Sequence, residues 1–381
     1  MTLLDGLLVA DFSRVLAGPL ATMTLADLGA TVVKVERPGG GDEARSWGPP
    51  WTASSSAYFD GVNRSKLGVT LDLASPADRA AAFELGRRAD VVVHNLRDMT
   101  RYGLSHDDVA AVNPGVVYCS ITGFGPATDR PGYDFLLQAV GGLMSITGDP
   151  DGQPRKVGVA LVDVLTGKDA VIGILAALHE RGRTGAGQHV QVDLLSSLLG
   201  ALVNQAASYL TTGVPPGRMG NQHPSIAPYE TLRCADGLLA VACGNDGQFA
   251  RLASTLGEPS WADDPRFATN PARVANRPAL VAELEARLGA ATAATWEARL
   301  IAAGVPAGRV GDIGSALALA SSVGLAPTVQ VGTARQVRHP VRYGTDDAVA
   351  APTPPPALGE HDVAVRAWLA GSPDAPLLPR P

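Results

Sequence analysis

The chain has 381 residues, of which 46% are hydrophobic and 18% charged, and its formal net charge is −6. These values exclude a disordered chain and offer no basic surface, so we expect a globular protein without a nucleic-acid partner. We find no signal peptide and no apolar run of membrane-spanning length, which predicts a cytoplasmic protein with no membrane partner. Three widely separated cysteines indicate reduced thiols and no zinc site.

The first third of the chain alternates apolar runs of strand length with segments of helical periodicity. Strands are predicted over 7–11, 30–36, 68–73, 89–93 and 116–122, and helices over 19–28 and 76–88. This alternation is typical of an α/β protein with a parallel sheet, which binds ligands beyond the carboxyl ends of its strands. The first loop has neither the G-x-G-x-x-G pattern nor a phosphate-loop lysine, so dinucleotide-dependent dehydrogenases and P-loop enzymes are disfavoured.

Basic and amide side chains follow several of these predicted strands. Arg37 follows the second strand, whereas Asn95, Arg97 and Arg101 follow the fourth. In a parallel sheet these loops meet at one edge, and a rim of arginines there would suit a ligand with several phosphates. Each arginine taken alone is equally compatible with a solvated surface charge, so both interpretations stay open.

The segment from Pro154 to Gly200 has one acid in an apolar setting. It predicts a strand over 157–162, then Asp163, a helix over 164–180, a strand over 188–193 and a second helix. Asp163 then stands near the start of a helix, where its oxygen can serve as an N-cap. The alternative is a nucleophile, because a helix N-terminus stabilises a carboxylate anion that can attack a thioester carbonyl.

The second half of the chain indicates a separate small domain. Residues 211–228 are rich in glycine, proline and polar side chains, which marks a linker. A hairpin over 229–244 and a mostly helical stretch over 246–299 follow. We therefore expect a large domain over 1–210, a small domain over 229–328, and a return to the large domain over 329–381 with a C-terminal helix and tail.

Several ordered motifs run along nearly the whole chain. They are DFSRVLAGPLATMTLADLGATVVKVERPGGGDEAR, NRSKLGVTLDL, YCSITGFG, PGYDFLLQAVGGLMSITG, VDVLTG, RTGAGQ, GNQHPSIAPY and LGEHD. Together they resemble the class III (CaiB/BaiF-type) coenzyme A transferases, and within that family the succinyl-CoA:dicarboxylate, glutarate-type branch. The resemblance implies an α/β fold: a Rossmann-like large domain with a parallel sheet, a smaller α+β domain, and two chains interlocked as a homodimer.

The resemblance also implies roles for particular residues. Asp163 in VDVLTG falls where these enzymes have the nucleophilic aspartate, and the substrates are acyl-CoA and a small carboxylate, with no metal or redox cofactor. The residues that fall at or beside the site for CoA are Leu16, Ala17, Arg37, Asn95, Arg97, Arg101, Tyr133 and Asp134. His223 and Ser225 in the linker are candidates for the acceptor pocket, and contact of Arg14 or Lys66 with phosphate is left open.

Two departures from the family pattern bear on specificity. The formyl-CoA transferases carry four successive glycines in a loop over the intermediate; no such run occurs here, which argues against formyl or oxalyl specificity. Leu16 stands where those enzymes place a glutamine.

Two other functions are weighed against CoA transfer. An α-methylacyl-CoA racemase needs a base on each face of the α-carbon, and that branch has a histidine where this chain has Tyr133, whose ordinary pKa of about 10 makes it a poor base. A non-catalytic CoA-binding protein would have no use for Asp163. The donor, expected to be succinyl-CoA, and the acceptor carboxylate are not determined by these motifs.

Overall fold

The computed structural model describes residues 2–53, 55–345, 348–372 and 375–381, which form two compact units. Unit 1 consists of Met1–Leu143, Val157–Gly213 and Ala326–Pro381, and unit 2 of Met144–Lys156 and Val214–Leu325. The expected domains place residues 144–156 in the large domain, whereas the contacts of this segment group it with unit 2. The expected linker is divided at Gly213.

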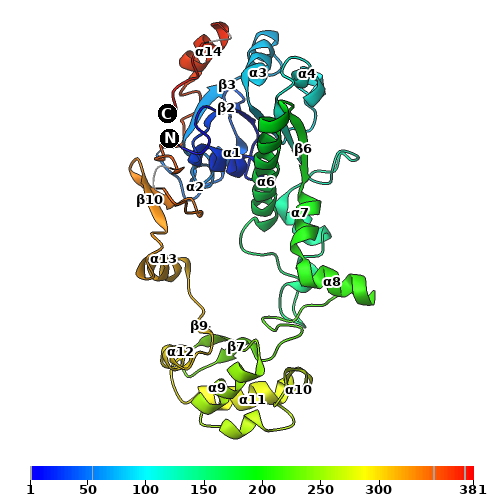
Figure 1. The fold of residues 1–381 in the computed structure, drawn as a ribbon, viewed down its shortest axis with the longest axis vertical. Coiled ribbons are helices and arrows are strands. Elements are labelled where there is room, and N and C mark those ends of the chain that lie inside the picture. The colour runs from blue at the N-terminus through cyan, green and yellow to red at the C-terminus, as the bar shows by residue number, and fades with distance from the viewer. Residues whose placement is uncertain (1, 54, 346–347, 373–374) are drawn as a thin grey trace. The chain divides into compact units, whose positions relative to one another are not determined.

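Unit 1 is built on a six-stranded parallel sheet in the order β3-β2-β1-β4-β5-β6 (Figure 1). Its strands are β1 (Leu8–Phe12), β2 (Thr31–Glu36), β3 (Lys66–Thr70), β4 (Val91–His94), β5 (Val117–Thr122) and β6 (Gln188–Asp193). The predicted Rossmann-like parallel sheet is therefore confirmed. The strand order reverses between β1 and β4, and such a reversal opens a crevice at the carboxyl ends of the strands.

Helices cover both faces of this sheet. Along β1, Leu8, Ala10 and Phe12 pack in a core with α3 (Pro76–Arg88) and α14 (Asp362–Ala370). Val9 points the other way, into a core with α1 (Ala17–Asp27) and α6 (Leu161–Thr184). Alternate side chains of a strand point to opposite faces, so a strand covered on both sides is mostly apolar; β1 is apolar except for Asp11, whose side chain is fully buried.

Unit 1 contains further helices and a hairpin outside this sheet. They are α2 (Ala57–Asp60), α4 (His106–Ala110), α5 (Asp134–Val140), α7 (Leu194–Ala201), α8 (Val203–Thr212) and the hairpin of β10 (Thr328–Val331) and β11 (Ala334–Val337), with 3₁₀ turns at Glu43–Ser46 and Thr100–Tyr102. The predicted bounds of α3 and β6 agree exactly with the structure, whereas the other predicted strands are shifted by one to a few residues.

The predicted strand over 157–162 is wrong. Its backbone bonds to a side chain of α5 and not to a neighbouring strand: the Val157 N–H donates to Gln138 Oε1 at 2.8 Å, and Gln138 Nε2 donates to the Val159 carbonyl at 3.3 Å. Helix α6 begins at Leu161 and continues past Gly182 to Thr184, where Gly185 ends it in a left-handed conformation. Asp163 therefore lies inside the first turn of α6.

Unit 2 pairs a small antiparallel sheet with helices around one core. The predicted hairpin is confirmed as β7 (Tyr229–Arg233) and β8 (Leu238–Ala242), to which β9 (Ala307–Arg309) adds. The helices are α9 (Asp246–Thr255), α10 (Asn270–Ala275), α11 (Arg277–Leu288), α12 (Ala293–Ala302) and α13 (Ile313–Ser322), with 3₁₀ turns at Met144–Ile146 and Pro259–Ala262. Trp261 and Trp296 are buried in this core, in agreement with the α+β assignment of the small domain.

Candidate active site

A cavity of about 410 Å³ lies at the carboxyl ends of the central strands of unit 1. The loop after β1, residues 14–17, and the loop after β4, residues 95–97, form one part of its wall. The end of β5 with the segment that follows it, from Ile121 to Tyr133, and the first turn of α6 form another part. The cavity thus occupies the crevice that the reversal of strand order predicts. Of the predicted site residues, it brings together Leu16, Ala17, Asn95, Arg97, Tyr133 and Asp163.

Asp163 is the carboxylic acid that α6 presents to this cavity. Burial, and then the nearby carboxylate of Asp134, raise the pKa of Asp163 to about 7. The helix N-terminus favours the anion of this acid, but desolvation and a like charge both favour the neutral form. Near pH 7, the ionised and neutral forms of the side chain are both populated.

Asp134 serves as a cap for the helix that carries Asp163. Its Oδ1 accepts hydrogen bonds from the backbone N–H groups of Val162, at 2.8 Å, and Asp163, at 3.4 Å. Its Oδ2 accepts a bond from Gln138 Nε2 at 2.7 Å. The N-cap residue of α6 itself, Ala160, makes no side-chain cap bond, so the N-cap interpretation of Asp163 is wrong: a residue from α5 satisfies the free amides instead.

Helix α1 packs beside α6 so closely that a glycine is required between them (Figure 1). A Cβ atom on Gly167, one turn beyond Asp163, would lie 2.7 Å from the carbonyl oxygen of Ala17. Gly167 therefore allows the second turn of α6 to approach the first turn of α1. Within the described part of the chain, the backbone N–H groups of Leu16 and Ala17 donate to no protein acceptor. The cavity wall thus contains amide donors next to an acid.

Asn95 and Arg97 line the cavity but are engaged with other protein groups. Asn95 Oδ1 accepts a bond from the Arg14 N–H at 2.9 Å, and Asn95 Nδ2 donates to the Arg14 carbonyl at 2.7 Å. Each polar atom of this amide therefore has one partner in the backbone of Arg14. Arg97 forms an ion pair with Asp129, with 3.0 Å between Nη2 and Oδ2, and both side chains are largely exposed. An exposed pair of this kind is weak.

Arg37 and Arg101 line a second, adjoining cavity of about 250 Å³. Its wall includes Arg14 and Leu96, which also line the first cavity, and the residues 71–74 after β3. The predicted single rim of arginines is therefore divided. Arg97 lines the same cavity as Asp163, whereas Arg37 and Arg101 line the second cavity. The guanidinium of Arg101 stacks on the Tyr102 ring, and Arg37 Nε donates to the Gly41 carbonyl at 3.1 Å. Asp134 is in the wall of neither cavity.

Sequence analysis missed two residues close to this site. The charge of Asp163 adds to burial in raising the pKa of Tyr58 to about 12, which places this phenol in the electrostatic field of the site. Arg130 lines the first cavity and stacks its guanidinium over the Phe124 ring, 4.4 Å from the centroid. Neither belongs to a local pattern that points to chemistry; Arg130 stands immediately before the PGYD motif, which is the one signal for it.

Lys66 does not meet the requirements for a phosphate contact. Its ammonium is fully buried and binds Asp11 Oδ2, the Pro19 carbonyl and Asn63 Oδ1 at 2.9 to 3.0 Å. His223 and Ser225 belong to unit 2, where the Ser225 N–H donates to His223 Nδ1 at 3.1 Å. The cavity around Asp163 is described entirely by residues of unit 1.

Comparison with known proteins identifies the class of enzyme that this fold and cavity define. The family model for CoA-transferase family III matches residues 4–362. A succinate–glutarate CoA-transferase of Agrobacterium fabrum is 48% identical over 285 residues, which cover 72% of this chain and 71% of that protein. An acetyl-CoA:oxalate CoA-transferase of Acetobacter aceti is 39% identical over 369 residues, covering 95% of this chain and 94% of the relative.

A solved structure agrees with these sequence matches. A CaiB/BaiF family protein from Brucella suis superposes with a TM-score of 0.87 at 44% identity, and the match covers 97% of this chain and 99% of the other. The protein is thus a CoA-transferase. The chain belongs to CoA-transferase family III, and the resemblance noted from its motifs is confirmed.

The described residues contain neither a candidate membrane span nor a candidate metal cluster. None of their helices has the length and apolar character needed to cross a membrane. None of their histidine, cysteine, aspartate and glutamate side chains gather in threes with the geometry of a metal site.

Proposed function

We propose that the protein transfers CoA from an acyl-CoA, expected to be succinyl-CoA, to a small dicarboxylic acid, with Asp163 as the covalent nucleophile. The observation that carries this proposal is the position of Asp163: a partly buried acid with a raised pKa, in a cavity whose wall includes unpaired amides at the start of α1. The names of relatives that act on glutarate support a dicarboxylate acceptor.

Four attacks complete one turnover. The Asp163 carboxylate attacks the thioester carbonyl of the donor and expels CoA thiolate, which leaves a mixed anhydride. The thiolate then attacks Cγ of Asp163, which releases the donor acid and forms an aspartyl-CoA thioester. The acceptor carboxylate attacks the same carbon and expels the thiolate, giving a second anhydride. Attack of the thiolate on the acceptor acyl carbon yields the new acyl-CoA and regenerates the Asp163 carboxylate. No electrons are gained or lost, and water is not consumed.

The surroundings of Asp163 favour each of these attacks. Poor solvation makes the anion reactive, and each tetrahedral intermediate carries an oxyanion that needs hydrogen-bond donors. The free N–H groups of Leu16 and Ala17 are donors of this kind, and the N-terminal end of an eleven-residue helix adds a favourable dipole. Because the anion is the nucleophile, the proposal requires activity to rise with pH through about 7, where Asp163 ionises.

The adjoining cavity suits the nucleotide end of CoA. Besides Arg14, which lines both cavities, its wall contains Arg37 and Arg101, which provide charged donors for phosphate oxygens. Arg14 and Leu96, which line both cavities, mark the passage along which the pantetheine arm reaches Asp163. In this arrangement Arg97 stands on the side of the thioester, and Arg37 and Arg101 hold the phosphates.

An α-methylacyl-CoA racemase is less well supported by this geometry. That reaction needs two free acid–base groups at the α-carbon. The carboxylate of Asp134 is already bonded to two amides at the start of α6 and to Gln138, and Tyr133 is 64% exposed. Neither Asp134 nor Tyr133 is therefore placed as a free base against a buried substrate carbon.

We also propose that the active form is a homodimer. Large apolar side chains are exposed on α8, where Leu210 is 81% and Val203 69% exposed, and on α13, where Ile313 is 83% exposed. Surfaces of this kind are typical of interfaces between subunits. Light scattering of the purified protein would measure the mass in solution. A cytoplasmic location stays a prediction, which cell fractionation would test.

The decisive experiment is mass spectrometry after incubation with succinyl-CoA and hydroxylamine. We expect a hydroxamate on Asp163, because hydroxylamine intercepts an anhydride or thioester at that carboxyl group. The Asp163→Ala variant should form none, and Asp169→Ala, which removes an exposed acid from the same helix, should behave as the wild type. CoA transfer without modification of Asp163 would contradict the mechanism. Exchange of an α-proton of an α-methylacyl-CoA in deuterated water, with Asp163 unmodified, would favour the racemase.

A further inference from the structure

The loop between β1 and α1 is held by the neighbouring side chain of Asp11 and by Lys34, Asp42 and Asn95 from more distant parts of the chain. From the Ser13 N–H to the Val15 N–H, five consecutive backbone groups each bond to a side chain. Loops more commonly satisfy such groups with water or with their own turns. A loop with all of these groups engaged has very little freedom to move, and this loop forms part of the wall around Asp163.

Asn95, in the loop after β4, holds the middle of this segment. Its Oδ1 accepts a hydrogen bond from the Arg14 N–H at 2.9 Å, and its Nδ2 donates one to the Arg14 carbonyl at 2.7 Å. The two residues stand on either side of the reversal in strand order, so this pair of bonds bridges the crevice at its base. An amide is the side chain that can supply both a donor and an acceptor in one plane.

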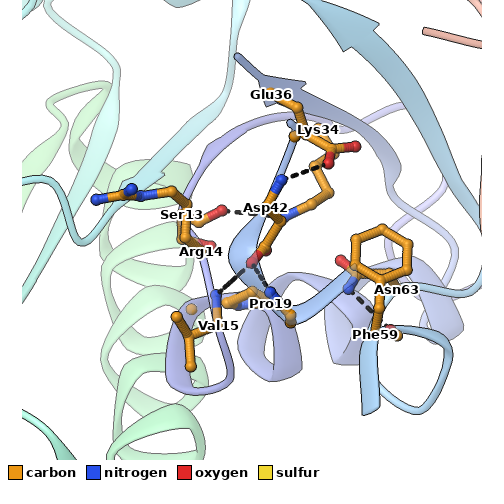
Figure 2. Close-up of polar contacts among 12 residues, drawn as sticks. Ser13, Arg14, Val15, Pro19, Lys34, Glu36, Asp42, Phe59 and Asn63 are labelled. Carbon is orange, nitrogen blue, oxygen red and sulfur yellow. Dashed lines mark hydrogen bonds and ion pairs between the residues drawn. The ribbon is translucent and has the colours of Figure 1, made fainter. Parts of the chain in front are cut away.

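A buried ion pair holds the two ends of the same segment (Figure 2). Asp42 accepts the Val15 N–H at 3.1 Å, and the fully buried ammonium of Lys34 donates both to Asp42 Oδ2 and to the Ser13 carbonyl at 3.0 Å. Burial alone would raise the pKa of Asp42, but Lys34 and backbone N–H donors hold it below its usual range. At neutral pH the pair is therefore ionised and its bonds to the loop are charge-assisted.

The conformation of Val15 shows that the loop is constrained. Its φ angle is 72°, in the left-handed region that β-branched residues rarely adopt. A further close approach supports the constraint: a Cβ atom on Gly18 would meet the Ser13 side chain at 2.2 Å, so the start of α1 lies directly against the clamped segment. These side-chain hydrogen bonds thus maintain a backbone conformation that is unfavourable for the loop residues by themselves.

We propose that Asn95, supported by the Asp42–Lys34 pair, is a positioning residue: it clamps the β1–α1 loop so that the first amides of α1 stand beside Asp163. This inference rests on the proposed function and changes the role expected of Asn95, whose amide is committed to Arg14 and not to CoA. A clamp of this kind raises the rate of the chemical steps, because donors for an oxyanion act only when they are in place beforehand.

The substitution Asn95→Asp tests the clamp with almost no change of volume. It keeps the acceptor for the Arg14 N–H and sets a carboxylate against the Arg14 carbonyl. We expect kcat to fall by about tenfold to a hundredfold, the range that small misplacements of catalytic groups cause. The KM for succinyl-CoA should stay within about threefold of the wild-type value. A raised KM with kcat retained would overturn the proposal and return Asn95 to a role in CoA binding.

A matched control exists elsewhere in unit 1. Asn113 is also partly buried, and its Nδ2 donates to the Ala89 carbonyl at 2.8 Å, in the loops that precede β4 and β5. We expect Asn113→Asp to keep the wild-type kcat. An equal loss of kcat in both variants would overturn the proposal, because the effect would then belong to any lost amide bond of unit 1.

Hydrogen exchange of the wild-type protein tests the clamp without a variant. Residue-resolved exchange over residues 12–20 should show protected amides at Arg14 and Val15 and fast exchange at Leu16 and Ala17, which have no protein acceptor. Equal, fast exchange at all four would overturn the clamp even if Asn95→Asp fails to fold. Failure of the proposed function is distinguishable: the wild type would form no hydroxamate at Asp163, while the exchange pattern would still report the clamp.

Discussion

The carboxylate of Asp134 accepts a hydrogen bond from the backbone N–H of Asp163 and at the same time raises the pKa of the Asp163 side chain. One acid therefore both fixes the helix start that presents a second acid and opposes the ionisation of that second acid. The two effects are separable by substitution, because an amide can still accept the backbone bonds but carries no charge.

Replacing Asp134 by asparagine should shift the acid limb of the pH–rate profile to lower pH. Burial still favours neutral Asp163, but the like charge is gone, so the pKa of Asp163 falls below its value of about 7 in the wild type. We expect a shift of up to about one pH unit in kcat/KM, which reports ionisation in the free enzyme. An acid limb at the wild-type pH would show that the charge of Asp134 does not influence Asp163.

Replacing Asp163 by asparagine should abolish transfer and stabilise the fold above neutral pH. The pKa of Asp163 is raised on folding, so between about pH 4 and pH 7 the native state binds more protons than the unfolded state, and stability falls as pH rises. One pKa unit corresponds to about 1.4 kcal/mol, and with a discount for partial exposure we expect a gain of about 1–2 kcal/mol at pH 8. Urea unfolding at pH 5 and pH 8 would measure it; the same gain at both values would contradict the prediction.

Removing Arg101 should weaken the binding of acyl-CoA through its phosphates. We expect Arg101→Ala to raise the KM for succinyl-CoA by about tenfold, the loss of one charge-assisted contact. The KM for a succinyl-pantetheine thioester, which lacks the phosphates, should not change. Arg183→Ala, which removes an exposed arginine near the end of α6, provides the control. Equal effects on both substrates would show that Arg101 does not bind phosphate.

Replacing Lys66 by methionine should destabilise unit 1 strongly. Its ammonium and the Asp11 carboxylate are both fully buried, 3.0 Å apart, and loss of one partner leaves a buried charge without compensation. Such losses cost about 3–5 kcal/mol, which a urea titration would detect. The double variant Lys66→Met with Asp11→Asn should recover part of that loss. No recovery in the double variant would show that the packing of Lys66, and not its charge, is what matters.

Local periodicity in the sequence predicted the bounds of some helices and strands. Helix α3 and strand β6 have the predicted bounds because 3.6-residue and two-residue periodicities are local features of the sequence. Asp163 is conspicuous in sequence for the related reason that a single acid interrupts an apolar run. The motifs that resemble the CoA transferases supplied the function, which neither composition nor periodicity contained.

By itself, the sequence determined the class of fold, the family and the acid at its centre; the tertiary structure decided what the polar side chains do. The run 157–162 has the composition of a strand, but Gln138 takes its backbone bonds. Asn95 directly follows a strand, which is the position expected of a ligand-binding residue. Its amide, however, is hydrogen-bonded to the backbone of Arg14, 81 positions earlier. A hydrogen bond is satisfied by whichever group lies within about 3 Å, and side chains so far apart along the chain become neighbours only when the sheet has assembled.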